Sequence, residues 1–329
     1  MDKVLVIGSN SFSGSDFIDL LLEEGKYQVM GVSRSPEKSA LFLPYKKKSS
    51  QNYTFHQIDL NQDLGKLNQL LDAFQPKYIV NFAAQSEVAP SWENPGHWFQ
   101  TNAVALTCLF NLLKDKKYLA KYVHISSPEV YGTCEGTVYE NAPLNPTTPY
   151  AASKAAGDLS LFTFYKNFHF PFVMIRATNV YGPYQQLFKI IPRSILYIKG
   201  NKPIELHGGG VAVKSYIHIR DVSKGELLAM EKGEIGQIYH LSPDAGVSVR
   251  SVVEQICKNL AVPFEKATVV APERLGQDKA YIIDSTKARR TLGWLPEIPL
   301  TKGVPNTIQW VQENYNELVK LPLSYVHKE

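Results

Sequence analysis

A tyrosine and a lysine four positions apart, Tyr150 and Lys154, are the residues of this chain best suited to chemistry. On a helix, positions i and i+4 lie on one face, so the ammonium can lie near the phenol. A free tyrosine has a pKa of about 10, but a neighbouring cation favours the phenolate and lowers that pKa. The pair is therefore suited to taking a proton from a sugar hydroxyl while a nicotinamide accepts a hydride.

A second reactive segment, Ser-Ser-Pro-Glu-Val-Tyr-Gly at 126–132, lies upstream of this pair. Glu129 adds a carboxylate that simple dehydrogenation does not need. Pro128 stands directly before it and offers neither a side-chain proton nor a backbone N–H. The alternative interpretation of Glu129 is a solvated loop carboxylate.

Alternating strand-like and helix-like segments must position these residues. A short apolar run predicts a buried strand at 4–7, and further strands are expected at 29–32, 53–58, 78–82, 122–126 and 171–177. Apolar residues at helical spacing predict helices at about 17–22, 64–74, 98–113 and 150–167. This alternation predicts an α/β fold built on a doubly wound parallel sheet.

The alternation of strands and helices ends after Gly182-Pro183, where proline and glycine become more frequent. A helix is expected at 249–260, with Ser248 placed to cap it. The chain is therefore expected to form a dinucleotide-binding domain over 1–178, joined by part of 211–240. Residues 179–329 are expected to form mainly a smaller C-terminal α/β substrate-binding domain.

The turn Gly8-Ser-Asn-Ser-Phe-Ser-Gly14 follows the first strand and opens the first helix. A helix N-terminus with free N–H groups suits a pyrophosphate, so Gly8, Ser11, Phe12 and Gly14 are candidate cofactor contacts. Ser11 takes the place of the usual middle glycine. The alternative is an ordinary strand-to-helix turn.

The end of the second strand bears on the choice of cofactor. An NAD site usually places an acid there, whereas an Arg accommodates the 2′-phosphate of NADP. Here Ser33 and Arg34 close the strand, and no acid comes before Glu37. We therefore favour NADP over NAD, against the alternative that Arg34 is a solvated loop residue. Further candidate cofactor contacts close the third and fourth strands: Asp59, Leu60, Phe82, Ala83 and Ala84.

Composition limits the partners of this chain of 329 residues, 44% of them hydrophobic. Its 35 basic and 31 acidic residues give a net charge of only +4, which does not indicate binding to nucleic acid. The three cysteines have no ligand-like spacing, so we expect no metal site and a reducing compartment. With no signal-peptide pattern and no membrane-spanning stretch, a cytoplasmic protein without membrane partners is expected.

Together these motifs resemble extended short-chain dehydrogenases/reductases, of the epimerase/dehydratase family that acts on nucleotide sugars. The resemblance is strongest to nucleotide-sugar 4,6-dehydratases of the dTDP-glucose and GDP-mannose types, and it covers essentially the whole chain. It rests on the glycine turn, the segments at 81–84 and 126–132, and the Tyr150/Lys154 pair. The segments at 176–183, 189–192, 216–222 and 292–294 also match in order.

The resemblance implies a Rossmann fold and a role for each matching residue. Ser127 would hydrogen-bond the sugar 4-hydroxyl, Tyr150 would be the base and Lys154 its electrostatic partner. Glu129 would remove the C5 proton, after which the C6 hydroxyl leaves as water. The dTDP-glucose type usually has an Asp acid where this chain has Pro128, and the GDP-mannose type lacks it.

The resemblance also implies a nucleotide-sugar substrate and a homodimer formed through helices. Candidate substrate contacts are Ser86, Asn179, Lys189, Lys214 and Arg274. The nucleotide base stays open, because residues 85–88 lean towards the GDP-mannose type and residues 201–204 towards the dTDP-glucose type. Pro128 keeps open a 4-epimerase or uronate decarboxylase, and Ser11 leaves an inactive cofactor-binding module as a remote alternative.

Overall fold

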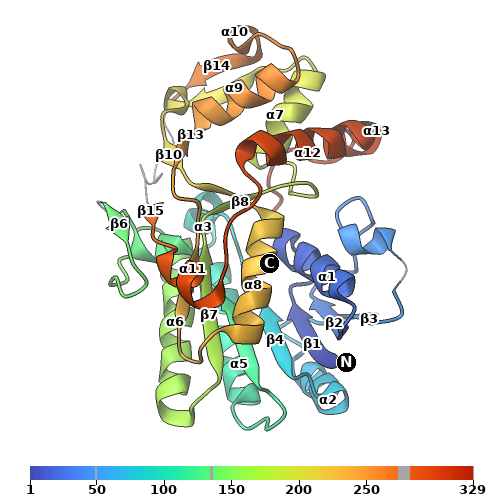
Figure 1. Ribbon diagram of the computed structural model, residues 1–329, viewed down its shortest axis with the longest axis vertical. Helices are drawn as coiled ribbons and strands as arrows, with labels where there is room; N and C mark the ends of the chain where they lie inside the picture. Colours follow the sequence, from blue (N-terminus) through green and yellow to red (C-terminus); the bar gives the residue numbers. More distant parts are fainter. Residues whose placement is uncertain (49, 134–135, 273–281, 329) are drawn as a thin grey trace.

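The computed structural model describes residues 1–48, 50–133, 136–272 and 282–328 (Figure 1). A large part surrounds a central sheet, and a smaller part lies above one edge of that sheet. Among the described residues, no helix combines the length and apolar character that crossing a membrane would need.

The central sheet has seven parallel strands in the order β12-β7-β5-β4-β1-β2-β3. Six confirm the predicted strands. The seventh, β12, comes from a proline- and glycine-rich region whose pattern was too short to predict a strand. The strands are β1 (Asp2–Ile7), β2 (Tyr27–Ser33), β3 (Tyr53–Gln57), β4 (Tyr78–Asn81), β5 (Lys121–Ile125), β7 (Phe172–Ala177) and β12 (Ile238–Leu241).

Helices cover both faces of this sheet, which confirms the doubly wound architecture. On one face lie α1 (Phe12–Glu24), α8 (Ile219–Lys232) and α11 (Thr286–Leu292). On the other lie α2 (Leu64–Phe74), α5 (Leu106–Leu113) and α6 (Pro149–Phe168). Because helices bury both faces, the inner strands are mainly apolar, whereas the edge strand β3 is only partly buried and mixes polar with apolar residues.

The helix predicted at 98–113 begins earlier and is not uniform. It runs as α4 (Pro95–Phe99), a π-helical turn η2 (Gln100–Ala105) and α5, and the short α3 (Ala89–Glu93) precedes it. Such turns often occur beside functional sites. Here the backbone of Gly157 in α6 packs against Asn102 in the turn, and a side chain at Gly157 would collide with it.

The smaller part has its own apolar cores between helices and a two-stranded sheet. The helix predicted at 249–260 is confirmed as α9, and the Ser248 hydroxyl caps it by accepting from Ser251 N. The elements are α7 (Ile190–Lys199), β9 (Ile204–His207), α9 (Val249–Asn259), α10 (Phe264–Ala267), β14 (Thr268–Ala271), α12 (Leu300–Glu313) and α13 (Tyr315–Leu318).

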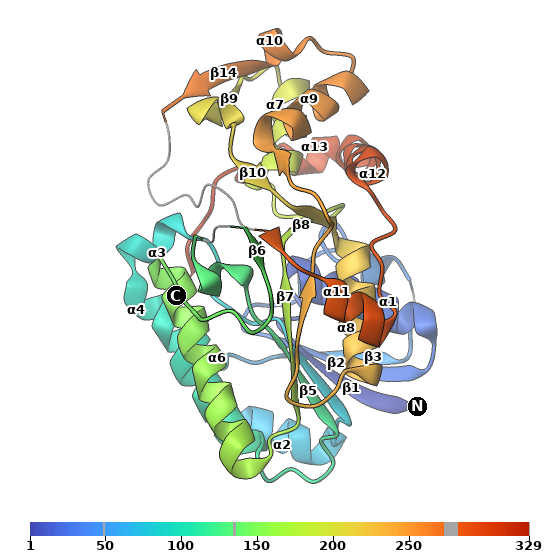
Figure 2. The same cartoon turned by 60° about the vertical axis from the view of Figure 1, so that its left-hand side comes forward.

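Short elements join the two parts at the carboxyl edge of the large sheet (Figure 2). The strands are β6 (Thr137–Val138), β8 (Asn179–Tyr181), β10 (Val213–Lys214), β11 (Tyr216–His218), β13 (Val247–Ser248) and β15 (Ile282–Ile283). The 3₁₀ turns are η1 (Pro44–Lys47), η3 (Pro128–Tyr131) and η4 (Gly208–Gly210). Beyond α13, the end of the chain returns to the large part beside α4.

Candidate active site

Helix α6 places Tyr150 in its first turn and Lys154 one turn later. The Thr148 hydroxyl starts the helix by accepting from Ala151 N at 3.1 Å. The Ser91 hydroxyl accepts from Tyr150 N at 3.2 Å, which fixes the start of α6 against α3. Lys154 is buried, and its Nζ donates to Ile125 O at the end of β5, at 2.8 Å.

The turn η3 brings Ser127 and Glu129 to the same place. Ser127 is extended, and its Oγ accepts from Glu129 N at 3.3 Å. Pro128 occupies the first position of the turn, where a backbone N–H would have no helical partner anyway. Ser127 is hydrogen-bonded to the side chain of Tyr150, and Glu129 is close enough to affect its charge. The structure thus brings Ser127, Glu129 and Tyr150 together, and Lys154 lies one turn further along the same helix.

A buried ionic network lies beneath these residues. Asp158, four positions after Lys154, accepts from Ser126 Oγ at 2.6 Å and from Arg176 Nη2 at 2.7 Å. His124 Nε2 lies 3.1 Å from the same carboxylate. Burial opposes ionisation of Asp158, but the His124 hydrogen bond and the Arg176 charge hold the pKa of its carboxyl well below the usual range.

The same surroundings tune Lys154. Burial lowers the pKa of its ammonium to about 8, the Asp158 carboxylate opposes that shift, and Arg176 adds to it. Lys154 therefore carries its charge below about pH 8 and loses it above. Asp158, four residues further along α6, is the anion that favours the charged form of Lys154.

Tyr150 behaves differently from the sequence expectation. Burial and the Glu129 carboxylate raise the pKa of its phenol above the ordinary value, while the Ser127 hydrogen bond lowers it. The expectation considered only the cation at i+4. It omitted the cost of burying a phenolate and the carboxylate two residues beyond Ser127.

The glycine turn opens α1 as the cofactor prediction requires. Gly8 has φ +84°, a conformation that favours glycine. Ser11 replaces the middle glycine without strain, because it is extended and its Oγ accepts from Gly14 N at 2.9 Å. Gly14 packs against Gly8 O, where a side chain would collide. The N-terminus of this thirteen-residue helix therefore suits a pyrophosphate.

The loop after β2 is held by Asn10, a residue that the sequence analysis did not single out. Asn10 N donates to Ser33 Oγ at 3.0 Å, and its side-chain amide donates to Ser35 O and Pro36 O at 3.0 and 2.9 Å. The position of Asn10 inside the glycine turn was the one feature of the sequence that could have indicated this role. Asn10 thus fixes the loop that carries Arg34.

Glu37, the first acidic residue after β2, makes contacts with the turn η1. Glu37 Oε1 accepts from the Tyr45 hydroxyl at 2.9 Å, and Glu37 Oε2 pairs with Lys46 Nζ at 2.7 Å. Arg34 Nη2 donates to Lys328 O at 3.1 Å. At the end of β2, Arg34 therefore contacts the C-terminal segment, whereas Glu37 contacts Tyr45 and Lys46.

The other candidate cofactor contacts divide into two groups. Leu60 and Phe82 are buried in the core, and the Phe82 ring lies 5.6 Å from that of Phe17, so they can offer a ligand only their backbone. Ala83 is half-buried and Ala84 exposed, which leaves this edge open. Asp59 accepts from Asn61 N at 2.9 Å and shapes the turn after β3.

The candidate substrate residues are more scattered. Asn179 is half-buried, and among the described residues its buried Oδ1 has no hydrogen-bond partner. Lys189, before α7, forms an ion pair with Glu87 in the loop after β4. Ser86 is exposed in that loop, and Lys214 is half-buried in β10. Arg274 lies outside the described residues.

Asn102 is a second positioning residue that the sequence analysis missed. Its Oδ1 accepts from Gln85 N at 2.8 Å, and its Nδ2 donates to Gln85 O and to Ser153 Oγ, both at 2.9 Å. It therefore ties the loop after β4 to α6. Its neighbours Gln100 and Thr101 are polar too, so the local sequence did not distinguish Asn102.

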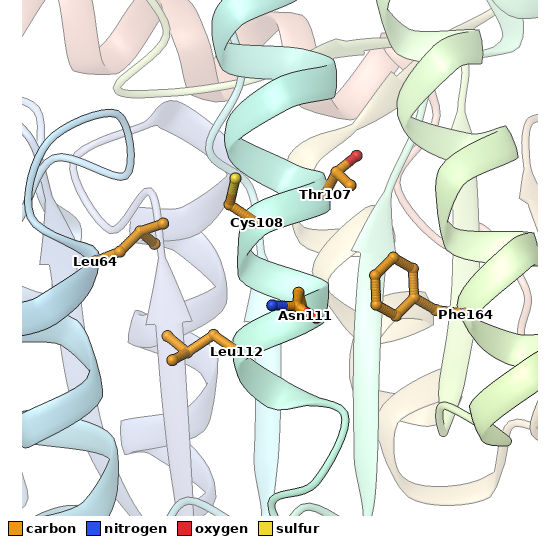
Figure 3. Close-up of a pocket in the computed structure, with 6 residues that line it drawn as sticks. All are labelled: Leu64, Thr107, Cys108, Asn111, Leu112 and Phe164. Atoms are coloured by element: carbon orange, nitrogen blue, oxygen red, sulfur yellow. The ribbon is translucent and has the colours of Figure 1, made fainter.

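A hollow on the outer side of α5 is separate from this site (Figure 3). Side chains from α2, α5 and α6 line it: Leu64, Thr107, Cys108, Asn111, Leu112 and Phe164. Its lining is mainly apolar and contains none of the candidate site residues. Among the described residues, no cluster of three or more His, Cys, Asp or Glu side chains could hold a metal ion.

Known proteins resemble this chain over nearly all its length. The family model described as GDP-mannose 4,6 dehydratase matches residues 5–307. A dTDP-glucose 4,6-dehydratase of Neisseria meningitidis is 28% identical, covering 95% of this chain and 94% of its own. One of Streptomyces niveus is 30% identical, covering 95% and 93%.

Solved structures agree with the observed fold. DesIV, a dTDP-glucose 4,6-dehydratase of Streptomyces venezuelae with NAD and TYD bound, superposes with a TM-score of 0.89 at 28% identity, covering 96% of this chain and 99% of its own. A UDP-glucuronic acid 4-epimerase of Bacillus cereus, in complex with UDP-glucuronic acid and NAD, gives 0.87 at 25% identity, covering 95% and 100%.

Proposed function

The chain belongs to the GDP-mannose 4,6 dehydratase family, and from that premise we propose that it is a nucleoside-diphosphate-sugar 4,6-dehydratase. This membership confirms the resemblance to extended short-chain dehydrogenases/reductases. The observation that carries the proposal is the position of Glu129, held by Ser127 beside the hydroxyl of Tyr150. That arrangement puts two proton acceptors at one place, and an elimination that follows an oxidation needs both.

The proposed roles follow from these contacts. Ser127 orients the sugar 4-hydroxyl and Tyr150 takes its proton. The Lys154 ammonium on the same helix face would favour the phenolate against the burial and the Glu129 charge that raise the pKa of the phenol. A ketone at C4 makes the adjacent C5 proton acidic, and Glu129 removes that proton. Water then leaves from C6, and Glu129, once protonated, supplies the proton that the leaving hydroxyl needs.

A nicotinamide dinucleotide fits the residues at the other end of the site, and when bound it would accept hydride from C4 and return it to C6. The N-terminus of α1 would hold its pyrophosphate and Arg34 its ribose. NADP is favoured, because Arg34 follows β2 while Glu37 is engaged by Tyr45 and Lys46. The solved relatives were crystallised with NAD, so the two dinucleotides must be compared directly.

A second candidate, a 4-epimerase, is favoured by one observation. Pro128 replaces the acid that a dTDP-glucose dehydratase would have beside Glu129, and a solved epimerase shares the fold. An epimerase would use Tyr150 in the same way but would eliminate nothing. A uronate decarboxylase is a further variant of this candidate.

The products of a substrate panel distinguish these activities. Purified protein is incubated with NADP or NAD and with dTDP-glucose, GDP-mannose, UDP-glucose or UDP-glucuronic acid. Mass spectrometry should find a product lighter by one water with at least one hexose donor. Unchanged mass with a new sugar configuration would indicate an epimerase, and loss of carbon dioxide a decarboxylase. An unchanged panel would contradict the proposal.

We also propose a homodimer formed through α5 and α6. Val104 in η2, and Leu159 and Phe168 on α6, are large apolar residues that are 49%, 55% and 50% exposed, and a dimer interface would cover them. The molar mass of wild type and of Leu159→Glu, measured by light scattering, tests this. The boundary near residue 178 and the cytoplasmic location remain predictions.

A further inference from the structure

The C-terminal segment of residues 319–328, called the strap below, crosses from the small part to the large part (Figure 2). It leaves the end of α13 and reaches α4 and the loops after β2 and β4. On the way, the Tyr325 ring meets the Phe188 ring edge-on, with 5.5 Å between centroids. The strap therefore has contacts in both parts.

His327 anchors the strap to α4. Its ring stacks on His97, 5.2 Å between centroids and 4° from parallel, and on Trp98 at 5.1 Å and 10°. Its Nε2 lies 2.8 Å from His97 Nδ1, within hydrogen-bonding distance. Trp98 is fully buried and so offers a fixed surface for the stack. This one side chain thus makes three contacts with the large part.

Lys328 ends the strap over the cofactor end of the sheet. Its carbonyl accepts from Arg34 Nη2 at 3.1 Å and from Gln85 Nε2 at 2.5 Å. Arg34 follows β2 and Gln85 follows β4, the two neighbours of β1. The carbonyl therefore spans the carboxyl end of β1, where Gly8 begins the glycine turn. A dinucleotide places its adenosine ribose at the end of β2, where Arg34 lies.

We propose that the strap is a displaceable occupant of the adenosine end of the dinucleotide groove and competes with the ribose phosphate for Arg34. This inference rests on the proposed cofactor. A phosphate is the stronger acceptor for a guanidinium than an uncharged peptide carbonyl, because its hydrogen bonds are charge-assisted. Entry of the phosphate therefore compensates for release of the strap.

The charges at this place favour the exchange. Burial, and after it the Lys328 ammonium, lower the pKa of Lys38, so the cationic side chains of Lys38 and Lys328 lie near each other beside Arg34. Like charges in proximity destabilise the closed strap, and an incoming phosphate neutralises them. An alternative arrangement, in which the strap clamps the bound dinucleotide, has the opposite consequence for affinity.

The binding test uses 2′,5′-ADP, which carries the adenosine end alone, and nicotinamide mononucleotide, which lacks it. His327→Ala removes the anchor, and Val326→Ala is the matched control, since Val326 is 59% exposed. If the strap is closed in about four of five molecules, His327→Ala should bind 2′,5′-ADP about fivefold more tightly in calorimetry. Nicotinamide mononucleotide and the control should show no change. An unchanged or weaker affinity of His327→Ala for 2′,5′-ADP would overturn the proposal.

Hydrogen exchange of the wild-type protein with NADP separates this inference from the proposed function. Faster exchange in the strap together with slower exchange at 8–14 is the expected result. Slower exchange at 8–14 with an unchanged or slower strap overturns the competition and leaves dinucleotide binding intact. No change in either segment overturns both, because then no dinucleotide binds.

Discussion

The two ends of the candidate site are built in different ways. At the sugar end, Ser127, Glu129, Tyr150 and Lys154 come from one turn and one helix, and a buried network holds them from beneath. At the adenosine end, Arg34 meets Lys328 from the far end of the chain. The sugar end is fixed by buried contacts alone, whereas at the adenosine end Asn10 holds the loop and an exposed segment contacts Arg34.

This difference indicates where rigidity is needed. Proton transfer requires the acceptor within hydrogen-bonding distance of the proton, and a buried frame maintains that distance. Cofactor exchange requires an opening, and a segment with few buried contacts can detach at low cost. Variants at the two ends should therefore fail in different ways: sugar-end variants in turnover or folding, and adenosine-end variants in affinity.

The largest effect is expected for Tyr150→Phe. Removing the hydroxyl removes the proton acceptor for the sugar, so turnover of the dehydratase substrate should fall about a thousandfold. The thermal midpoint and dinucleotide affinity should change little. Tyr139→Phe, at a 55% exposed position, is the control and should keep full turnover. Turnover of Tyr150→Phe within tenfold of wild type would show that another group is the base.

Asp158→Asn tests the frame beneath the sugar end. It leaves the Arg176 guanidinium, 1% exposed, without its anion, which should cost about 3 kcal/mol of the free energy of unfolding. Urea denaturation measures this loss. The double variant Asp158→Asn/Arg176→Met should recover part of it, because the Arg176 charge is then no longer buried without its anion, although Lys154 still lacks the nearby carboxylate. Equal stability of the single variant and wild type would mean that the pair is not part of the frame.

Glu226 tests the support of α1, which carries the glycine turn. It is buried on α8, and burial and nearby Asp16 raise the pKa of its carboxyl well above the usual value. The folded protein thus keeps a proton that the unfolded chain loses above its pKa of about 4.5, so stability falls as pH rises.

Glu226→Gln removes that penalty. Its stability advantage over wild type should grow by about 1.4 kcal/mol for each pH unit above the unfolded pKa, until the folded carboxyl ionises. Thermal or urea denaturation across pH 5–8 measures this. Glu254→Gln, at an exposed position of α9, is the control. A constant difference across this range would show that Glu226 is not protonated in the folded state.

Arg34→Ser should have the smallest effect and should act on affinity alone. Loss of one charge-assisted contact to a 2′-phosphate should weaken NADP binding about tenfold. NAD lacks that phosphate, so its affinity should change little, and calorimetry with both dinucleotides measures the difference. An equal loss for both would remove the reason for favouring NADP.

Local patterns predicted the sugar end well. Tyr150 and Lys154 are four residues apart on one helix, and Ser127 and Glu129 share a single turn, so spacing alone places each pair. Pro128 also has a local explanation, since it occupies the first position of that turn. The six predicted strands are confirmed because strand formation also follows local sequence, as in the continuous apolar run of β1.

Contacts between distant segments were not predictable in this way. No pattern near Arg34 indicates that Lys328 will meet it, because that contact depends on how the whole chain closes. The pKa of Tyr150 is a further example: spacing showed the nearby cation, but the burial that raises the pKa exists only in the folded protein. Asn102 likewise shows its role only once η2 and α6 pack together.

The division of labour between Tyr150 and Glu129 is the central claim, and a single turnover of Glu129→Gln tests it most directly. The variant, loaded with dinucleotide, is mixed with the sugar nucleotide that the wild type dehydrates. Absorbance follows the reduced nicotinamide, and mass spectrometry follows the sugar. We predict that the dinucleotide becomes reduced and stays so, while no product lighter by one water forms. Formation of that product at the wild-type rate would contradict the account.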